Sequence, residues 1–143
     1  MRFLVIIKAN EKSERGEMPP PELFSAMNDF NEELVKAGMM LGGEGLYPSS
    51  KGKRLHFSGS GKVTVTDGPF AETKELVAGF WIIKAKSMEE MVQWMKRCPT
   101  TPDGGTIEIR PIYELEDIPA DALPPEEAER ERRMREQIEG KKV

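Results

Sequence analysis

Residues 78–98, AGFWIIKAKSMEEMVQWMKRC, combine a strand pattern with an amphipathic helix pattern that follows it directly. Aromatic and β-branched residues fill 78–84, which predicts a buried strand. Ser87 and Glu90 have the spacing of a capping box, in which Ser87 caps the Glu90 N–H and the Glu90 side chain bonds back. Pro99 ends the predicted helix. The apolar positions of that helix recur every three or four residues: Met88, Met91, Val92 and Met95.

The N-terminal part repeats this strand-then-helix order. Residues 2–7, RFLVII, form a short apolar run of strand length. A polar, proline-containing loop follows, and Pro21 suits the first turn of a helix that Gly38 then ends. The predicted helix carries one apolar stripe, formed by Leu23, Phe24, Met27, Phe30, Leu34 and Val35.

Four further segments complete the predicted fold. Residues 39–46 indicate a strand in which glycines allow a bulge or a close backbone approach. Residues 54–57 and 62–66 flank SGSG and predict a β-hairpin, and 106–112 alternate as a last strand. The order β-α-β-(hairpin)-β-α-β predicts an α+β, ferredoxin-like fold. Because two helices cover only one face of such a sheet, we expect a homodimer with facing sheets.

Charge divides the chain into two parts, a domain at 1–113 and a tail at 114–143. The domain has 15 acidic and 15 basic residues, whereas the tail has 10 acidic and 6 basic ones. A neutral domain argues against nucleic-acid binding, and the cluster Lys51, Lys53 and Arg54 is interpreted as a solvated strand edge. For 126–139 three states remain open: an exposed helix, disorder, or a helix docked on a partner subunit.

Single cysteine and histidine residues limit the chemistry. Cys98 cannot form an internal disulfide, and His56 alone cannot build a His-based metal site within one chain. We interpret Cys98 as a core residue rather than a nucleophile. No apolar run is long enough for a membrane span, and the N-terminal run is too short for a signal peptide. We expect a cytoplasmic protein without metal, cofactor, nucleic-acid or membrane partners.

The loop at 67–75, DGPFAETKE, is the candidate functional segment. Asp-Gly-Pro is turn chemistry, in which the aspartate accepts backbone N–H bonds and glycine permits a positive φ. The same nonapeptide concentrates ionisable side chains around Phe70, which is typical of a pocket with convergent polar groups. A structural turn and a functional site therefore both remain open. In the structural version, Lys74 pairs with Glu72 or Glu75 on the surface.

TVTDGPFAETKELVAGFWII at 64–83 resembles the signature of the YCII-related proteins of the DGPF subfamily. Further matching segments are 30–34 with 37–38, 43–46 with 48–50, and 108–112. The resemblance covers about residues 1–113 and implies a dimeric α/β-barrel of ferredoxin-like subunits. Related proteins have a pocket His–Asp pair, whose Asp corresponds to Asp67, while His56 lies in the inserted hairpin and is not matched to the histidine. Some relatives are encoded near extracytoplasmic-function sigma factors, which implies a regulatory connection.

Two functional hypotheses follow. The first is a small-molecule-binding protein, with or without catalysis, in which Asp67 acts as general base or orienting acceptor. In it Glu44 and Glu72 assist, Lys74 receives an anionic group and Phe70 walls the pocket. The alternative is a non-catalytic regulatory or protein-interaction module that uses the charged tail or the dimer surface. No Walker A loop, GxSxG elbow or dinucleotide fingerprint is present to name a reaction.

Overall fold

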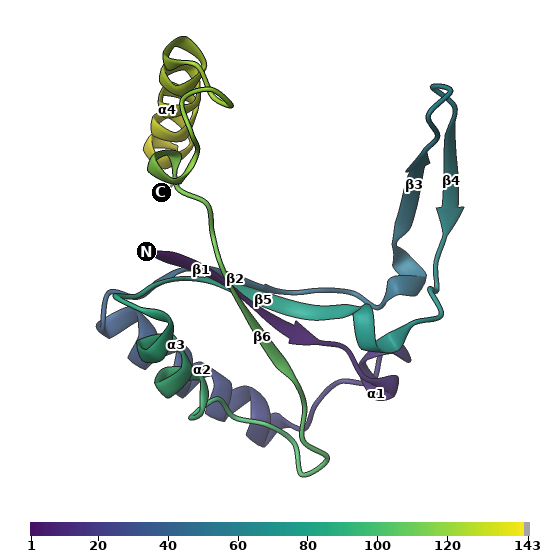
Figure 1. Ribbon diagram of the computed structural model, residues 1–143. Helices are drawn as coiled ribbons and strands as arrows, with labels where there is room; N and C mark the ends of the chain where they lie inside the picture. The colour runs from purple at the N-terminus through teal and green to yellow at the C-terminus, as the bar shows by residue number, and fades with distance from the viewer. Residues whose placement is uncertain (142–143) are drawn as a thin grey trace. The chain divides into compact units, whose positions relative to one another are not determined.

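The structure is a computed structural model that describes residues 1–141 and divides into two compact units (Figure 1). Unit 1 is Met1–Pro111, and the second unit begins at Ile112. Each predicted strand and helix of unit 1 is present within one or two residues of its predicted ends, except at the C-terminus of α3. The elements of unit 1 are β1 (Arg2–Lys8), α1 (Glu11–Glu14), α2 (Pro21–Lys36), β2 (Met40–Gly45), β3 (Lys53–Phe57), β4 (Val63–Asp67), β5 (Val77–Lys84), α3 (Met88–Met95) and β6 (Ile107–Pro111).

The main sheet has four strands in the order β2-β5-β1-β6, and every neighbouring pair is antiparallel. Strands β3 and β4 pair with each other as a separate two-stranded sheet. The predicted mixed α+β class with antiparallel strands is therefore confirmed.

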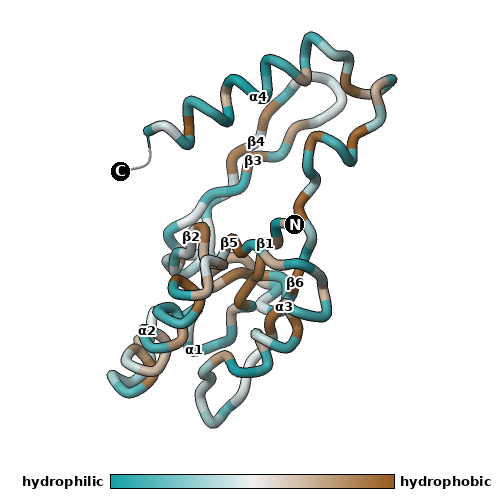
Figure 2. Tube along the Cα trace, turned by 90° about the vertical axis from the view of Figure 1, so that its left-hand side faces the viewer, coloured by the Kyte–Doolittle hydropathy of each residue, from teal (hydrophilic) through white to brown (hydrophobic). Residues whose placement is uncertain are grey.

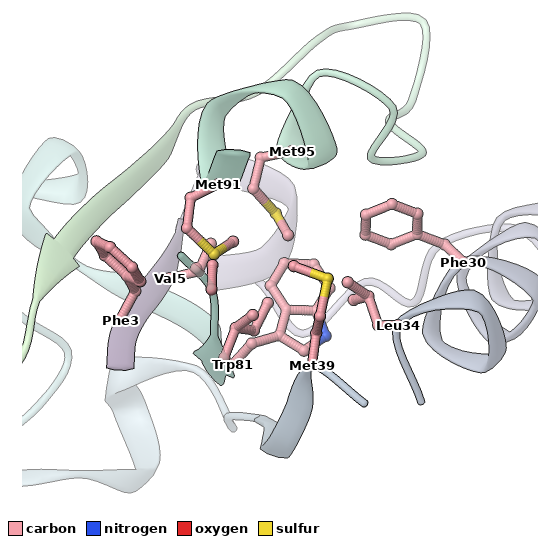
Figure 3. Packing of buried hydrophobic residues seen from close by; sticks show 10 residues of the cluster. Phe3, Val5, Phe30, Leu34, Met39, Trp81, Met91 and Met95 are labelled. Atoms are coloured by element: carbon pink, nitrogen blue, oxygen red, sulfur yellow. The ribbon is translucent and has the colours of Figure 1, made fainter. Parts of the chain in front are cut away.

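One face of the main sheet carries the hydrophobic core. The register places Phe3 opposite Ile83 and Val5 opposite Trp81, so these four side chains point to the same side. Helices α2 and α3 cover that side (Figure 1). Figure 3 shows Leu34 of α2 together with Met91 and Met95 of α3 among the same cluster of buried side chains.

Trp81 is fixed in this core by two specific contacts. Its ring meets that of Phe30 edge to face, with centroids 6.1 Å apart, and its Nε1 donates to Asn31 Oδ1 at 2.9 Å. Gly43 lies directly opposite Trp81 in β2, and a Cβ built there would lie 2.8 Å from the indole ring. The predicted close approach at the strand glycines is thus found at Gly43, and the predicted bulge lies between Met40 and Gly42.

Helix ends follow the sequence signals, with one correction. Gly38 has a φ of 71°, and Met39 N donates to Leu34 O, which is a Schellman cap after α2. Ser87 Oγ accepts from Glu90 N at 3.1 Å as predicted. The Glu90 carboxylate, however, accepts from Lys86 N at 2.7 Å instead of Ser87 N, so the reciprocal half of the capping box is wrong.

Within unit 1, no helix covers the opposite face of the main sheet (Figure 1). Alternation along β1 and β5 places Leu4 opposite Ile82 and Ile6 opposite Phe80 on this side. We call this side of the main sheet, which carries these four residues, the open face. All four side chains are half-buried within the described chain.

The β3–β4 hairpin projects away from α2 and α3, on the side of the open face, and Figures 1 and 2 agree on this. Every residue of both strands is exposed. Its strands match the predicted hairpin, and its tip is the predicted SGSG loop, closed by Ser58 N donating to Lys62 O.

The second unit contains a 3₁₀ turn at Leu115–Asp117 and helix α4 (Pro125–Gly140). This segment is helical, and none of the helix residues is buried within the single chain. Docking of the helix on a partner subunit stays a prediction. Within the unit, Arg135 pairs with Glu131 at 2.7 Å and with Glu114 at 3.5 Å. Across residues 1–141, no helix has the length and apolar character of a membrane span.

Candidate functional site

The 67–70 turn packs against the turn at residues 48–52. Gly68 N donates to Gly52 O at 3.0 Å, and the Gly68–Pro69 peptide bond is cis. A Cβ built on Gly68 would lie only 1.8 Å from Ser49 O, so only glycine fits this backbone contact. Gly68 is not among the residues with positive φ, which corrects the reason expected for glycine at this position.

Ser49 connects three segments that are distant in the sequence. It begins the 3₁₀ turn Ser49–Lys51, and its N–H donates to Glu14 Oε2 at 3.0 Å. Its hydroxyl donates to Glu14 Oε1 and accepts from Phe70 N at 3.0 Å. Glu14 is the last residue of α1, a short helix that Asn10 caps through Ser13 N. This half-buried network therefore holds α1, the 48–52 turn and the 67–70 turn together.

Phe70 is half-buried, with the Arg54 guanidinium 3.9 Å from the centre of its ring. Arg54 comes from β3, so this cation–π contact ties the base of the hairpin to the turn. Phe70 also lies beside Gly52, and its role as a pocket wall stays a prediction.

Asp67 is the last residue of β4 and lies opposite Lys53 in the hairpin. The two side chains form an ion pair, and the Asp67 side chain is 75% exposed. The expected turn cap is wrong for the two amides that follow, because Gly68 N and Phe70 N bond to Gly52 O and Ser49 Oγ. In the single chain Asp67 is thus a solvated carboxylate rather than a desolvated one.

Glu72 and Lys74 line a shallow depression of about 520 Å³ together with Thr73. The opposite wall is Ala9, Asn10 and Glu11, from the end of β1 and the start of α1. Both charged side chains are exposed. Within residues 1–141, Lys74 forms no ion pair with Glu72 or Glu75, so the surface pairing expected in the structural interpretation of the loop is absent there.

Glu44 lies on β2 opposite Phe80, and alternation therefore places it on the open face. The structure brings Glu72 and Lys74 together, sets Asp67 and Phe70 at the base of the hairpin, and leaves Glu44 on the sheet. Sequence reasoning missed Glu14 and Ser49 as the residues that organise the turn. Pro48-Ser49-Ser50 was part of the family resemblance, whereas Glu14 lies in a stretch expected to be loop, without a distinguishing signal.

Among the described residues three groups have shifted pKa values, and hydrogen bonding to Asp103 raises the pKa of the exposed Lys12 amino group. Burial raises the pKa of the Cys98 thiol to about 11, which fits the predicted core role better than a nucleophile. Arg110, followed by Lys8, lowers the pKa of the Glu108 carboxyl on β6. In the described part of the chain, no three His, Cys, Asp or Glu residues are grouped so that they could hold a metal ion.

These observations define an α+β domain with a helix-covered antiparallel sheet, an open second face and an inserted hairpin fixed by a glycine-containing turn. The chain belongs to the YCII-related domain family, whose model matches residues 1–116. It is 34% identical to an uncharacterised protein of Rhizobium meliloti (strain 1021) over 97 residues. The matched region covers 66% of this chain and 77% of that protein.

A solved structure was also found among the similar proteins. It is the 5-chloro-2-hydroxyhydroquinone dehydrochlorinase of Burkholderia phenoliruptrix AC1100 in complex with 2,5-dihydroxybenzoquinone. The two chains share 17% identity with a TM-score of 0.46, over 79% of this chain and 94% of that one.

Proposed function

We propose that this chain is a cytoplasmic small-molecule-binding protein of the DGPF subfamily, with a ferredoxin-like subunit that works as a homodimer. The observation that carries the proposal is the open face, where Leu4, Ile6 and Phe80 form an apolar floor without a covering helix. A second copy facing this floor would enclose it and exclude water. Ligand sites of this kind combine apolar walls with a few placed polar groups.

Polar groups stand at both margins of this floor. Glu44 lies beside Phe80 on β2. On β6, Glu108 pairs with Lys8 at 3.4 Å and with Arg110 at 3.3 Å. A site with a carboxylate at one margin and two cations paired with a second carboxylate at the other suits a small polar compound with an apolar body.

The loop residues complete the proposed site. Asp67 acts as general base or orienting acceptor, Phe70 provides a wall, and Glu72 and Lys74 assist or receive an anionic group. In the single chain, Asp67 is solvated and ion-paired with Lys53. Enclosure by the second copy would exclude water from the carboxylate and bring it within reach of a bound ligand, as a general base or orienting acceptor requires.

A thermal-shift screen of the full chain with a panel of small carboxylic acids and amines tests the binding function. We expect at least one compound to raise the melting temperature in the wild type. Glu44→Gln should reduce that shift, because it removes a charge from the open face while keeping the side-chain shape. Glu32→Gln changes an exposed carboxylate on α2, on the other side of the sheet, and should leave the shift unchanged. A panel without any hit, or equal shifts in both variants, would contradict the proposed site.

The second candidate function is a non-catalytic regulatory or protein-interaction module, linked to sigma-factor regulation by the resemblance. The second unit favours it, since α4 is rich in charge and exposes Met134 and Ile138 one turn apart. Figure 2 shows how little hydrophobic colour this helix otherwise carries. A chain that binds no panel compound, and whose partner binding requires α4, would favour this function over the first.

A further inference from the structure

The β3–β4 hairpin has one apolar face. Its register pairs Leu55 with Val65 and Phe57 with Val63, and residues paired across two strands point to the same side. These four side chains are 55%, 58%, 70% and 46% exposed, respectively. The opposite side carries Arg54, His56, Thr64 and Thr66.

Nothing in unit 1 covers this apolar face. The hairpin forms its own two-stranded sheet, and its base is held by the Gly68–Gly52 hydrogen bond and the contact of Arg54 with Phe70. A two-stranded hairpin alone is only marginally stable in water and needs further strands or another element packed against its apolar side. Four clustered large apolar side chains therefore indicate a surface that another molecule buries.

The hairpin and the open face project to the same side of unit 1, away from α2 and α3 (Figure 1). Strands of five residues reach about 17 Å, whereas two packed sheets lie about 10 Å apart. A hairpin that rises from one sheet is therefore long enough to cross the gap and lie along the flank of a sheet that faces it.

The net charge of the hairpin favours contact with the body of a second copy over contact with a second hairpin. Residues 51–67 contain four basic residues and one acidic residue. The rest of 1–113 contains 11 basic and 14 acidic residues, so hairpin and body have opposite net charges. Two hairpins would repel each other, whereas a hairpin and the body of a second copy attract.

We propose that the hairpin is an arm that buries Leu55, Phe57, Val63 and Val65 against the body of a second copy of this chain. This inference rests on the homodimer of the proposed function and adds a specific contact between its two copies. Two copies related by a twofold axis each give one arm and receive one, so both contacts form together. The facing sheets alone cover about 400 Å² in projection, from four strands about 20 Å long. Stable interfaces bury about 800 Å² of surface per partner, and the arms supply additional area.

The test is sedimentation of the full chain over a range of concentrations. Leu55→Thr with Val65→Thr removes one apolar pair and places a β-branched residue, which favours strands, at both positions. We expect the dimer Kd to rise by at least about tenfold, since two buried apolar side chains are lost. His56→Thr introduces the same residue on the opposite side of β3 and should change the Kd by less than about twofold.

Hydrogen exchange of the wild-type chain gives a second measurement that needs no folded variant. Hairpin amides should be protected in the dimer and exchange quickly when dilution produces monomer. A dimer whose Kd the double variant leaves unchanged would overturn the arm contact and leave the sheet-to-sheet dimer standing. Protected hairpin amides in a monomeric chain would overturn it too, because the cover would then come from the chain itself.

The ligand screen separates this inference from the proposed function. A wild-type chain that dimerises through the hairpin but binds no panel compound supports the arm and removes the binding function. A chain that remains monomeric at every concentration overturns the arm, whatever the screen finds.

Discussion

The backbone of Gly68 lies against the carbonyl group of Ser49, and a Cβ at Gly68 would fall 1.8 Å from the Ser49 oxygen. This contact joins the two turns at the base of the hairpin. It also explains why the nonapeptide at 67–75 has glycine after its aspartate, because any side chain there would meet backbone and not a movable side chain. The turn therefore fixes the position from which β3 and β4 project.

Substitution of Gly68 by alanine should be strongly destabilising. The added methyl group must displace the 48–52 turn, and we expect a loss of roughly 2–4 kcal/mol in unfolding free energy. Gly59→Ala is the matched control, since a Cβ at Gly59 meets nothing within 4 Å and should change stability by less than about 0.5 kcal/mol. Urea unfolding followed by circular dichroism measures both. Equal stability of the two variants would show that the turns separate without cost.

Ser49→Ala should weaken the same junction through its hydrogen bonds. The substitution leaves Phe70 N without its acceptor and removes one donor from the Glu14 carboxylate, both in half-buried positions. We expect a loss of about 1–3 kcal/mol. Ser50→Ala changes an exposed neighbour and should leave the unfolding free energy nearly unchanged. If the two serine variants unfold alike, water replaces the Ser49 hydroxyl without loss.

The strands and the two main helices could be predicted from local sequence because each has a strong periodic signal. The alternation in 106–112, the stripe through Phe30 and Leu34, and the Ser87 cap all describe interactions within a few residues. The same holds for Gly38, whose positive φ follows from its place after a helix. These elements supply most of the core of unit 1, and the other two residues of this buried cluster, Met39 and Ala85, lie directly beside strand ends.

The candidate site was less predictable because its contacts link residues far apart in the sequence. Glu14 and Ser49 are 35 positions apart, and no local pattern indicates that they meet. Asp67 has a turn signature, yet its carboxylate pairs with Lys53 across the hairpin, because that register places them opposite each other. Local turn chemistry was thus overridden by cross-strand pairing and by the packing of two turns.

Cys98 should react slowly with thiol reagents in the folded chain. Burial raises its pKa from 9.0 to about 11, so the thiolate fraction at pH 8 falls roughly a hundredfold. The half-buried sulfur also limits access for the reagent. Iodoacetamide labelling followed by mass spectrometry should be slow in buffer and fast in urea. Equal rates in the two conditions would contradict the core role of Cys98.

A chain that ends at Tyr113 should fold without the tail. The buried hydrophobic residues of the described chain all lie between Phe3 and Met95, inside unit 1. We therefore expect the shortened chain to be soluble and to melt within a few degrees of the full chain. Scanning calorimetry of both chains measures this. Aggregation of the shortened chain would show that the tail covers apolar surface.

Substitutions of Asp67 separate its role in binding from any role in folding. The carboxylate is exposed and pairs with Lys53, so both Asp67→Asn and Asp67→Ala should change unfolding free energy by less than about 0.5 kcal/mol.

Ligand binding should respond differently if the Asp67 charge contacts the ligand. Asp67→Asn, which keeps the shape and removes the charge, should then weaken a hit of the thermal-shift panel at least about tenfold in Kd, measured by calorimetry. Asp29→Asn, on α2, also removes an exposed charge and should bind like the wild type. Equal binding by Asp67→Asn and the wild type would mean that Asp67 serves only the hairpin, through Lys53. The near-neutral stability expected for all three variants is what allows a change in binding to be assigned to the carboxylate itself.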